Sequence, residues 1–160
     1  MSTAYVPPGK LSIFTVEGPT ITVVAMFNPK ELGVSKATPW TKNVKSKGNV
    51  PDLEFTSSDG RSMSFELMFD TYELGTNVHT VFVDNLVKMG MVRNPDGSEE
   101  EKRPPKVKVQ WANGALPAFE GVVESVETKY TMFFPDGTPC RATCNVKIKE
   151  ANALSFKKGT

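Results

Sequence analysis

The segment from Cys140 to Lys149 alternates strictly between small or apolar residues and polar ones. A period of two is typical of a β-strand with one buried face and one face in water. Because a slip of one residue would bury the charged set, the pattern also predicts which face points to the core. The expected buried set is Cys140, Ala142, Cys144, Val146 and Ile148, and the expected wet set is Arg141, Thr143, Asn145, Lys147 and Lys149.

This alternating segment is the second arm of a long β-hairpin that we expect over residues 119–150. Pro135, Asp136 and Gly137 separate its two arms. Proline presets φ, aspartate caps a turn with its side chain and glycine tolerates a positive φ, so the tripeptide predicts a tight turn. A long ribbon with one wet side should therefore dominate the fold.

Further strands are expected before this hairpin. Segments 10–17 and 20–27 predict two strands joined at Gly18-Pro19. We expect the second of these strands to be covered on both sides, because Val24 and Met26 make its other face apolar too. Three more strands are predicted at 53–56, 62–70 and 106–111. The pattern of 62–70 buries four residues, with Met68 as the exception: Met63, Phe65, Leu67 and Phe69.

One helix is expected over residues 77–89, with Thr76 or Asn77 as its cap. His79 is the only histidine of the chain and falls in the first turn, outside the apolar stripe of this helix. No neighbouring serine, cysteine or carboxylate group accompanies it, so we expect a structural role. The stripe itself repeats at spacings of three and four and consists of Val78, Val81, Phe82, Leu86 and Met89.

Segment 33–60 is expected to leave the body of the domain as an extended loop or hairpin. Loops of this length are uncommon inside compact domains and are usually functional or ordered by a partner. Trp40 favours a partner, because aromatic anchors are typical of interface centres. A plain solvated loop is the equally weighted alternative.

The chain of 160 residues is expected to form a single domain, 1–160, with an N-terminal arm at 1–9 and a C-terminal tail at 151–160. Its net charge of +1 argues against bulk attraction to nucleic acid or to an anionic membrane. No apolar run reaches the length of a membrane span, and the N-terminus lacks the pattern of a signal peptide. Assembly in a cytoplasm is therefore expected.

Chemical motifs do not point to an enzyme, and no cofactor or metal site is expected. The sequence lacks the nucleophile elbow, the phosphate-binding loop and the dinucleotide fingerprint. Cys140 and Cys144 lie four residues apart on one strand, so their Cα atoms are roughly 13 to 14 Å apart and too distant for a disulfide. The adjacent acids at 99–101 are typical of a solvated loop rather than of a Ca²⁺ site.

An alternative function is a small β-barrel that binds single-stranded nucleic acid or a glycan. Basic residues on the wet faces, such as Lys106 and Lys108, are compatible with it. Binding of single strands also needs aromatic side chains on the same face. Here the aromatic residues mostly share the buried parity, which weakens this interpretation.

Several stretches together resemble a known family: FNPKEL at 27–32, FELMFDTYELGTNV at 65–78, the helix at 77–89, PPKVKVQW at 104–111 and the hairpin at 119–150. They resemble the tube-domain family of contractile injection systems and contractile phage tails. In particular, they are similar to its baseplate tube-adaptor, or tube-initiator, proteins. The most specific pieces are YTMFFPDGTPCRA at 130–142 and FDTYELGT at 69–76.

The resemblance implies a mainly β (α+β) tail-tube fold. Two packed antiparallel sheets would form a small barrel or sandwich with one flanking helix. It also implies a structural, non-enzymatic baseplate component, whose hexameric ring connects the inner tube to the central hub and spike. The expected partners are copies of the chain itself, a tube ring above, the hub or spike protein below, and baseplate wedge or sheath proteins. The particle would be a phage tail or a toxin-delivery device assembled in the bacterial cytoplasm.

The resemblance also implies roles for particular residues. Adaptors of this type often carry a C-terminal LysM-type module, for which residues 151–160 leave no room, so we expect it to be absent or the chain to be a shorter phage-type relative. The wet set of the hairpin, Arg141, Thr143, Asn145, Lys147 and Lys149, would line the lumen. The 33–60 segment would contact a neighbouring subunit or ring through Trp40, Lys42, Lys45, Lys47 and Asp59.

Overall fold

The computed structural model describes residues 9–45, 47–112, 114–152 and 154. The expected N-terminal arm and C-terminal tail lie almost wholly outside these residues. The elements are β1 (Leu11–Thr15), β2 (Thr22–Val24), β3 (Leu32–Ser35), β4 (Trp40–Lys42), β5 (Leu53–Phe55), β6 (Ser62–Asp70), the helical segments η1 (His79–Val83) and α1 (Asp84–Lys88), β7 (Val107–Trp111), β8 (Phe119–Phe133) and β9 (Pro139–Glu150). The expected mainly β class, with two antiparallel sheets and one helical region, is confirmed.

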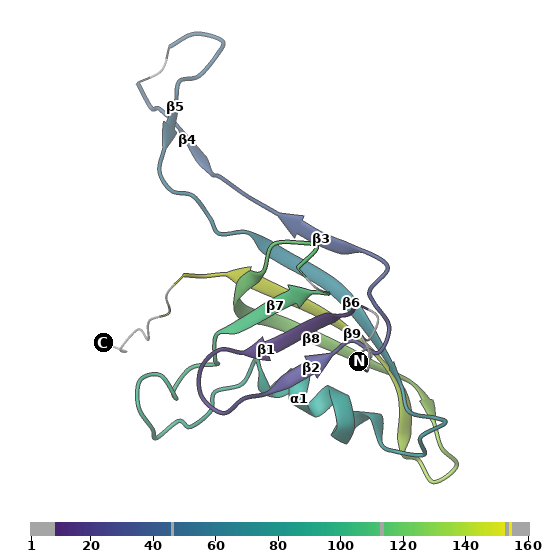
Figure 1. Cartoon of the computed structure of the whole chain (residues 1–160). Coiled ribbons are helices and arrows are strands. Elements are labelled where there is room, and N and C mark those ends of the chain that lie inside the picture. Colours follow the sequence, from purple (N-terminus) through teal and green to yellow (C-terminus); the bar gives the residue numbers. More distant parts are fainter. Residues whose placement is uncertain (1–8, 46, 113, 153, 155–160) are drawn as a thin grey trace, which may run out of the picture.

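The long hairpin forms the middle of the larger sheet (Figure 1). This sheet has seven strands in the order β2-β1-β7-β8-β9-β6-β3, and the smaller sheet consists of β4 and β5. Strand β9 pairs with β6 along the whole of β6, from Ser62 opposite Lys149 to Asp70 opposite Arg141. On its other side β9 pairs with β8, with irregularities in the register of β8. The prediction of a dominant ribbon is therefore confirmed.

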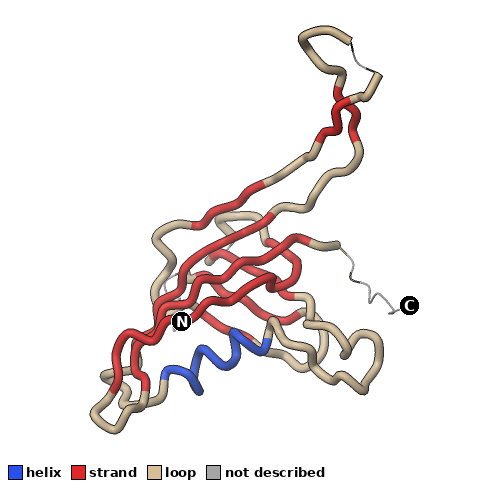
Figure 2. The backbone as a smooth tube through the Cα atoms, turned by 180° about the vertical axis from the view of Figure 1, so that it is seen from behind, coloured by secondary structure: helices blue, strands red, loops and turns tan. Residues whose placement is uncertain are grey.

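The larger sheet curls, so that the chain just after the edge strand β2 meets strand β6 near the opposite edge. The backbone N–H of Asp70 lies 3.4 Å from the sulfur of Met26. The curled sheet encloses one core, and the helical region lies along one side of it (Figure 2). Four residues of this region complete the core: Val78, Val83, Leu86 and Met89. The flanking helix is thus part of the core packing.

The facing of β9 and the turn before it are both as the sequence predicts. All five residues of the expected buried set are at most 1% exposed. In the turn, the N–H of Phe134 donates to the carbonyl of Thr138 at 2.8 Å. The Asp136 carboxylate accepts from the N–H of Thr138 at 3.0 Å, and Gly137 has a φ of +92°. The turn therefore uses aspartate and glycine for the reasons that made them turn signals.

The predicted apolar stripe of the helix is wrong at Val81, which is 42% exposed, while Val83 is buried. The reason is that residues His79–Val83 form a π-helical turn. Hydrogen bonds from i to i+5 widen this turn, so the residue five positions after Val78 faces the core. Asn77 is confirmed as the capping side chain, because its oxygen accepts from the N–H of His79 at 2.9 Å.

Strand β2 is not covered on both sides, contrary to expectation. Val23 is buried, but Val24 is 50% exposed. Thr22 and Val24 point to the face opposite Val23 and both are exposed, so the described chain leaves that face of β2 uncovered. Met26, by contrast, is partly buried, because the chain has left the strand there and crosses towards β6. From the sequence alone, an exposed apolar residue on a strand cannot be told from a buried one.

Glu17, which follows strand β1, binds residues at the end of the 94–105 loop and directly before β7. Its carboxylate forms an ion pair with Arg103 and accepts from the backbone N–H of Lys106 at 2.7 Å. Both charged side chains are largely buried, at 21% and 17% exposure. The hydrogen bond from Arg103 is the main reason why the pKa of Glu17 is lowered, and the N–H of Lys106 adds to the effect.

Replacing Cys144 by serine should lower the free energy of unfolding by about 1 to 3 kcal/mol. The thiol is fully buried and its sulfur lies 3.6 Å from the hydroxyl oxygen of Thr128. A serine hydroxyl, on a shorter bond, would be left without a well-placed partner. Asn145→Ser, at the next and exposed position, is the control and should change stability by less than about 0.5 kcal/mol. Urea unfolding measures both, and the reverse order of effects would mean that the facing of β9 is wrong.

Glu17→Gln should destabilise the protein by about 1 to 3 kcal/mol at neutral pH. The folded-state pKa of Glu17 lies below its ordinary value of 4.5, so its stabilising contribution is present above that value. It is lost as the pH falls through the folded-state pKa. Urea unfolding at several pH values should therefore show the gap between wild type and variant closing in acid. A gap independent of pH would contradict this account.

Candidate interface surfaces

The expected lumen residues do lie together on the outward face of β9. Arg141 and Thr143 are half-buried, and Asn145, Lys147 and Lys149 are exposed. Strand β9 lies between β6 and β8, so this face continues onto both neighbours. The side chains directly across from Asn145 and Lys147 are polar as well: Ser64 and Glu66 on β6, and Ser125 and Glu127 on β8. Thr143 lies opposite Met68, which is apolar and 40% exposed. We call this three-strand surface the wet face.

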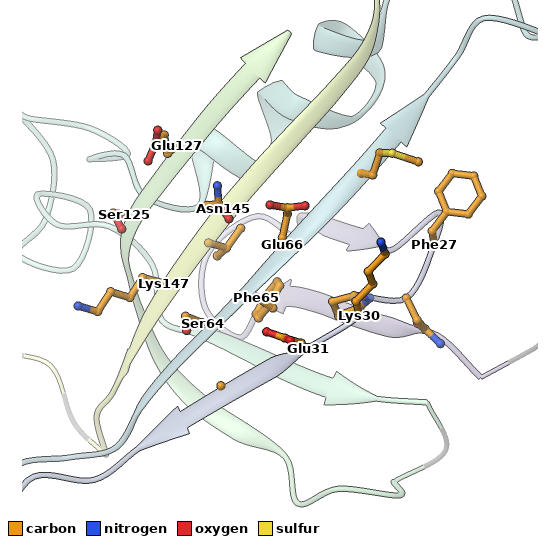
Figure 3. A pocket seen from close by; sticks show the side chains of 15 residues that line it. Phe27, Lys30, Glu31, Ser64, Phe65, Glu66, Ser125, Glu127, Asn145 and Lys147 are labelled. Carbon is orange, nitrogen blue, oxygen red and sulfur yellow. The ribbon is translucent and has the colours of Figure 1, made fainter. Parts of the chain in front are cut away.

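The wet face is hollowed. A cavity of about 760 Å³ lies over it, and the connection 27–31 between β2 and β3 forms one wall. In Figure 3, Lys30 and Glu31 lie on that side and Ser125 and Glu127 on the other, with Asn145 and Glu66 between them. The surface is therefore concave, and its lining combines hydroxyl, amide and charged groups with apolar side chains such as Phe27 and Met68.

Some charges of the wet face neutralise one another. Both Nε and Nη2 of Arg141 donate to Oδ2 of Asp70, at 3.1 and 2.9 Å. The pKa of Asp70 is lowered, first by the backbone N–H of Tyr72 and then by Arg141. Lys147 Nζ lies 3.9 Å from a carboxylate oxygen of Glu124. Such paired charges do not create the single-sign field that attracts a polyanion.

Segment 36–59, which we call the arm, projects far from the body and carries the small sheet at its outer part (Figure 1). Trp40 pairs with Phe55, and Lys42 pairs with Leu53. Directly paired residues share one face of a sheet, so these four side chains form one face of the arm, the arm face. Trp40, Leu53 and Phe55 are 54%, 58% and 59% exposed. The arm face is thus apolar and uncovered by its own chain.

The five expected interface residues do not form a single cluster. Trp40 and Lys42 lie on the arm face, and Lys45 and Lys47 are exposed in the tip between β4 and β5. Asp59 lies instead at the base of the arm, where its N–H donates to the carbonyl of Ala37 at 3.2 Å. Its own carbonyl accepts from Lys36. Asp59 therefore belongs to the root of the arm.

A second exposed apolar surface escaped the sequence analysis. Phe27, Tyr72 and Leu74 are 50%, 54% and 65% exposed, and they line a cavity of about 460 Å³. We call these three residues the aromatic pole. The sequence signal that could have revealed it is a tyrosine and a leucine in a short turn that ends at Gly75, where a solvated turn would carry polar residues.

The aromatic pole is held in place by its neighbours. Thr71 is fully buried, and its N–H donates to the carbonyl of Cys140 at 2.7 Å. Its hydroxyl donates to the carbonyl of Thr76 at 2.6 Å, which closes the turn between them. The ring of Tyr72 stacks on Phe134 with their centroids 5.8 Å apart. The pole is therefore a preformed surface, because its turn is pinned to the start of β9.

His79 has a structural contact. Its Nδ1 lies 2.5 Å from the hydroxyl of Tyr130, which joins the helical region to β8. Burial raises the pKa of Tyr130. The described part of the chain holds no group of three or more histidine, cysteine, aspartate or glutamate side chains that could bind a metal ion. Within the same residues, no helix is long and apolar enough to cross a membrane.

Comparisons with known proteins show the family to which the chain belongs. A solved structure described as the tail of an empty GTA particle with C6 symmetry is similar over 92% of this chain and 96% of that one, with 16% sequence identity and a TM-score of 0.41. No curated protein matches. The family model for the contractile injection system tube protein matches residues 11–158. The chain therefore belongs to the contractile injection system tube protein family.

Proposed function

We propose that copies of this chain close into a hexameric ring that connects the inner tube of a contractile injection machine to its central hub and spike. Membership of the tube protein family makes the chain a structural component of such a tail or injection machine. The ring, its place at the junction and its non-enzymatic role are the proposal. The hexameric number and the hub contact are carried over from the resemblance of the sequence to tube adaptors.

The observation that carries the proposal is the uncovered arm face. An isolated two-stranded ribbon is at best marginally stable in water. This one exposes Trp40, Leu53 and Phe55 on a single face, far from its own core. A contiguous apolar surface of this kind is typical of a protein contact. A neighbouring subunit or ring that covers the arm face would supply the missing half of its packing.

The sheet edges support closure into a ring. Strands β2 and β3 are the two ends of the sheet order, so among the described residues neither has a strand partner on its outer edge. Open edges invite pairing with another chain. Contacts between two different surfaces of identical subunits generate a closed ring when the rotation between subunits closes.

The wet face supports a channel wall. It is concave, it carries polar and charged side chains from β6, β8 and β9, and it lies on the outward side of the central ribbon. In a ring it would face the lumen and keep the passage hydrated. The alternative, binding of single-stranded nucleic acid or glycan, gains no support from this face. Its central positions on β9 are arginine, threonine, asparagine and lysine, where a stacking platform needs aromatic rings.

The arm can be removed without touching the core, which allows a direct test. The N–H of Asp59 already donates to the carbonyl of Ala37 across the root of the arm, as the residues that flank a two-residue hairpin turn do. Residues 38–58 would therefore be replaced by Asn-Gly. The pairing of β3 with β6 is kept. We expect the shortened chain to fold with unchanged thermal stability and to lose assembly. The measurement is analytical ultracentrifugation and negative-stain microscopy, with the tube and hub proteins encoded beside it.

Two results would contradict the proposal. One is an intact chain that stays monomeric with both partner proteins present. The other is a shortened chain that forms the same rings as the intact one. A variant with Asp96→Ser, at an exposed position of the 94–105 loop, is the control for non-specific effects of substitution on assembly.

A further inference from the structure

We propose that the arm face of one copy docks on the aromatic pole of a second copy. The inference rests on the proposed function in one respect, since it needs copies of the chain to assemble. It goes further by naming the acceptor surface. The arm face consists of Trp40, Lys42, Leu53 and Phe55, and the acceptor is the cavity lined by Phe27, Tyr72 and Leu74.

The two surfaces lie at opposite ends of the same strand. Strand β6 begins at Ser62, where the chain returns from the arm, and ends at Asp70, beside the pole. Its nine residues span roughly 27 Å. Figure 1 shows the arm pointing away from the other end of the body. The arm therefore cannot reach the aromatic pole of its own chain, and an arm that fills the pole must come from another copy.

The apolar parts match in kind and in size. The arm presents an indole and a phenyl ring in edge-to-face contact, with centroids 5.5 Å apart and planes at 66°. The pole offers a cavity of about 460 Å³ whose aromatic and aliphatic walls are joined by the charged side chains of Asp70, Glu73 and Arg141. Pockets of a few hundred cubic ångströms commonly hold aromatic anchors, and Trp and Tyr are frequent at such centres. Inserting the Trp40 ring would cover both surfaces at once.

Charges of opposite sign accompany the apolar groups. Lys42 shares the arm face with Trp40, and Glu73 lines the pole cavity with Arg141. No ion pair is recorded for Lys42 or Glu73 within the described residues. Arg141 is held by Asp70 with its guanidinium at the cavity, where it could lie over an inserted indole ring. Lys42 and Glu73 would then fix the orientation of the docked arm.

Photo-crosslinking tests the contact in the intact chain. A benzoylphenylalanine replaces Trp40, and unlabelled and ¹⁵N-labelled chains are mixed so that links between copies are recognised by mass. We expect the benzoylphenylalanine at position 40 to link to residues 70–75 of a second copy, which lie in its tryptic peptide 62–88. Links to the arm peptide 48–61 instead, or no link between copies at high concentration, would overturn the proposal.

A charge exchange provides an independent test. Lys42→Glu alone and Glu73→Lys alone should each weaken self-association by roughly tenfold, and the double variant should recover it. Leu74→Ser should weaken it by a similar factor, while Val16→Ala, an exposed apolar residue outside both surfaces, should leave it unchanged. Sedimentation at a series of concentrations gives these values.

The charge-exchange outcomes separate this inference from the proposed ring. Rings that form without a crosslink between position 40 and the aromatic pole would refute the proposed acceptor surface but not the proposed ring. A double variant that self-associates no better than either single variant would do the same. A wild-type chain that stays monomeric even with the tube and hub proteins present would refute both.

Discussion

Burial of one face of the β8–β9 ribbon is the interaction on which the rest of the structure depends. Its five inward residues on β9 are essentially inaccessible to water, and β6, β7 and the helical region all pack against the same core. Because side chains alternate along a strand, burying one set forces the other set outward. The concave wet face is thus a direct consequence of how the core is built.

The same constraint explains where the apolar surface of the chain is left over. The curled sheet and the helical region enclose the core, and two groups of exposed apolar side chains lie at the two ends of β6. At one end is the arm face around Trp40, and at the other the aromatic pole around Tyr72. Two different apolar surfaces at opposite ends favour contacts between unlike faces, which is the geometry of rings and stacks.

Much of the body could be predicted from the sequence, because strand periodicity and turn residues act locally. The facing of Cys144 and Asn145 and the turn at Gly137 are examples. The π-helical turn could not be predicted, because the spacing of five between Val78 and Val83 does not fit the α-helical period of 3.6. The exposure of Val24 depends on which face of the sheet another element covers, and the pole at Tyr72 depends on the end of the sheet at which its turn lies. These are properties of topology, which no local pattern carries.

The central claim is that this chain forms rings whose lumen is lined by the wet face. A cryo-electron microscopy reconstruction of the chain assembled with its tube and hub proteins tests it most directly. The account predicts a closed six-fold ring with Asn145 and Lys147 facing the channel and each arm seated on another subunit. A ring with the wet face turned outward, or a particle that lacks this chain at the tube, would contradict it.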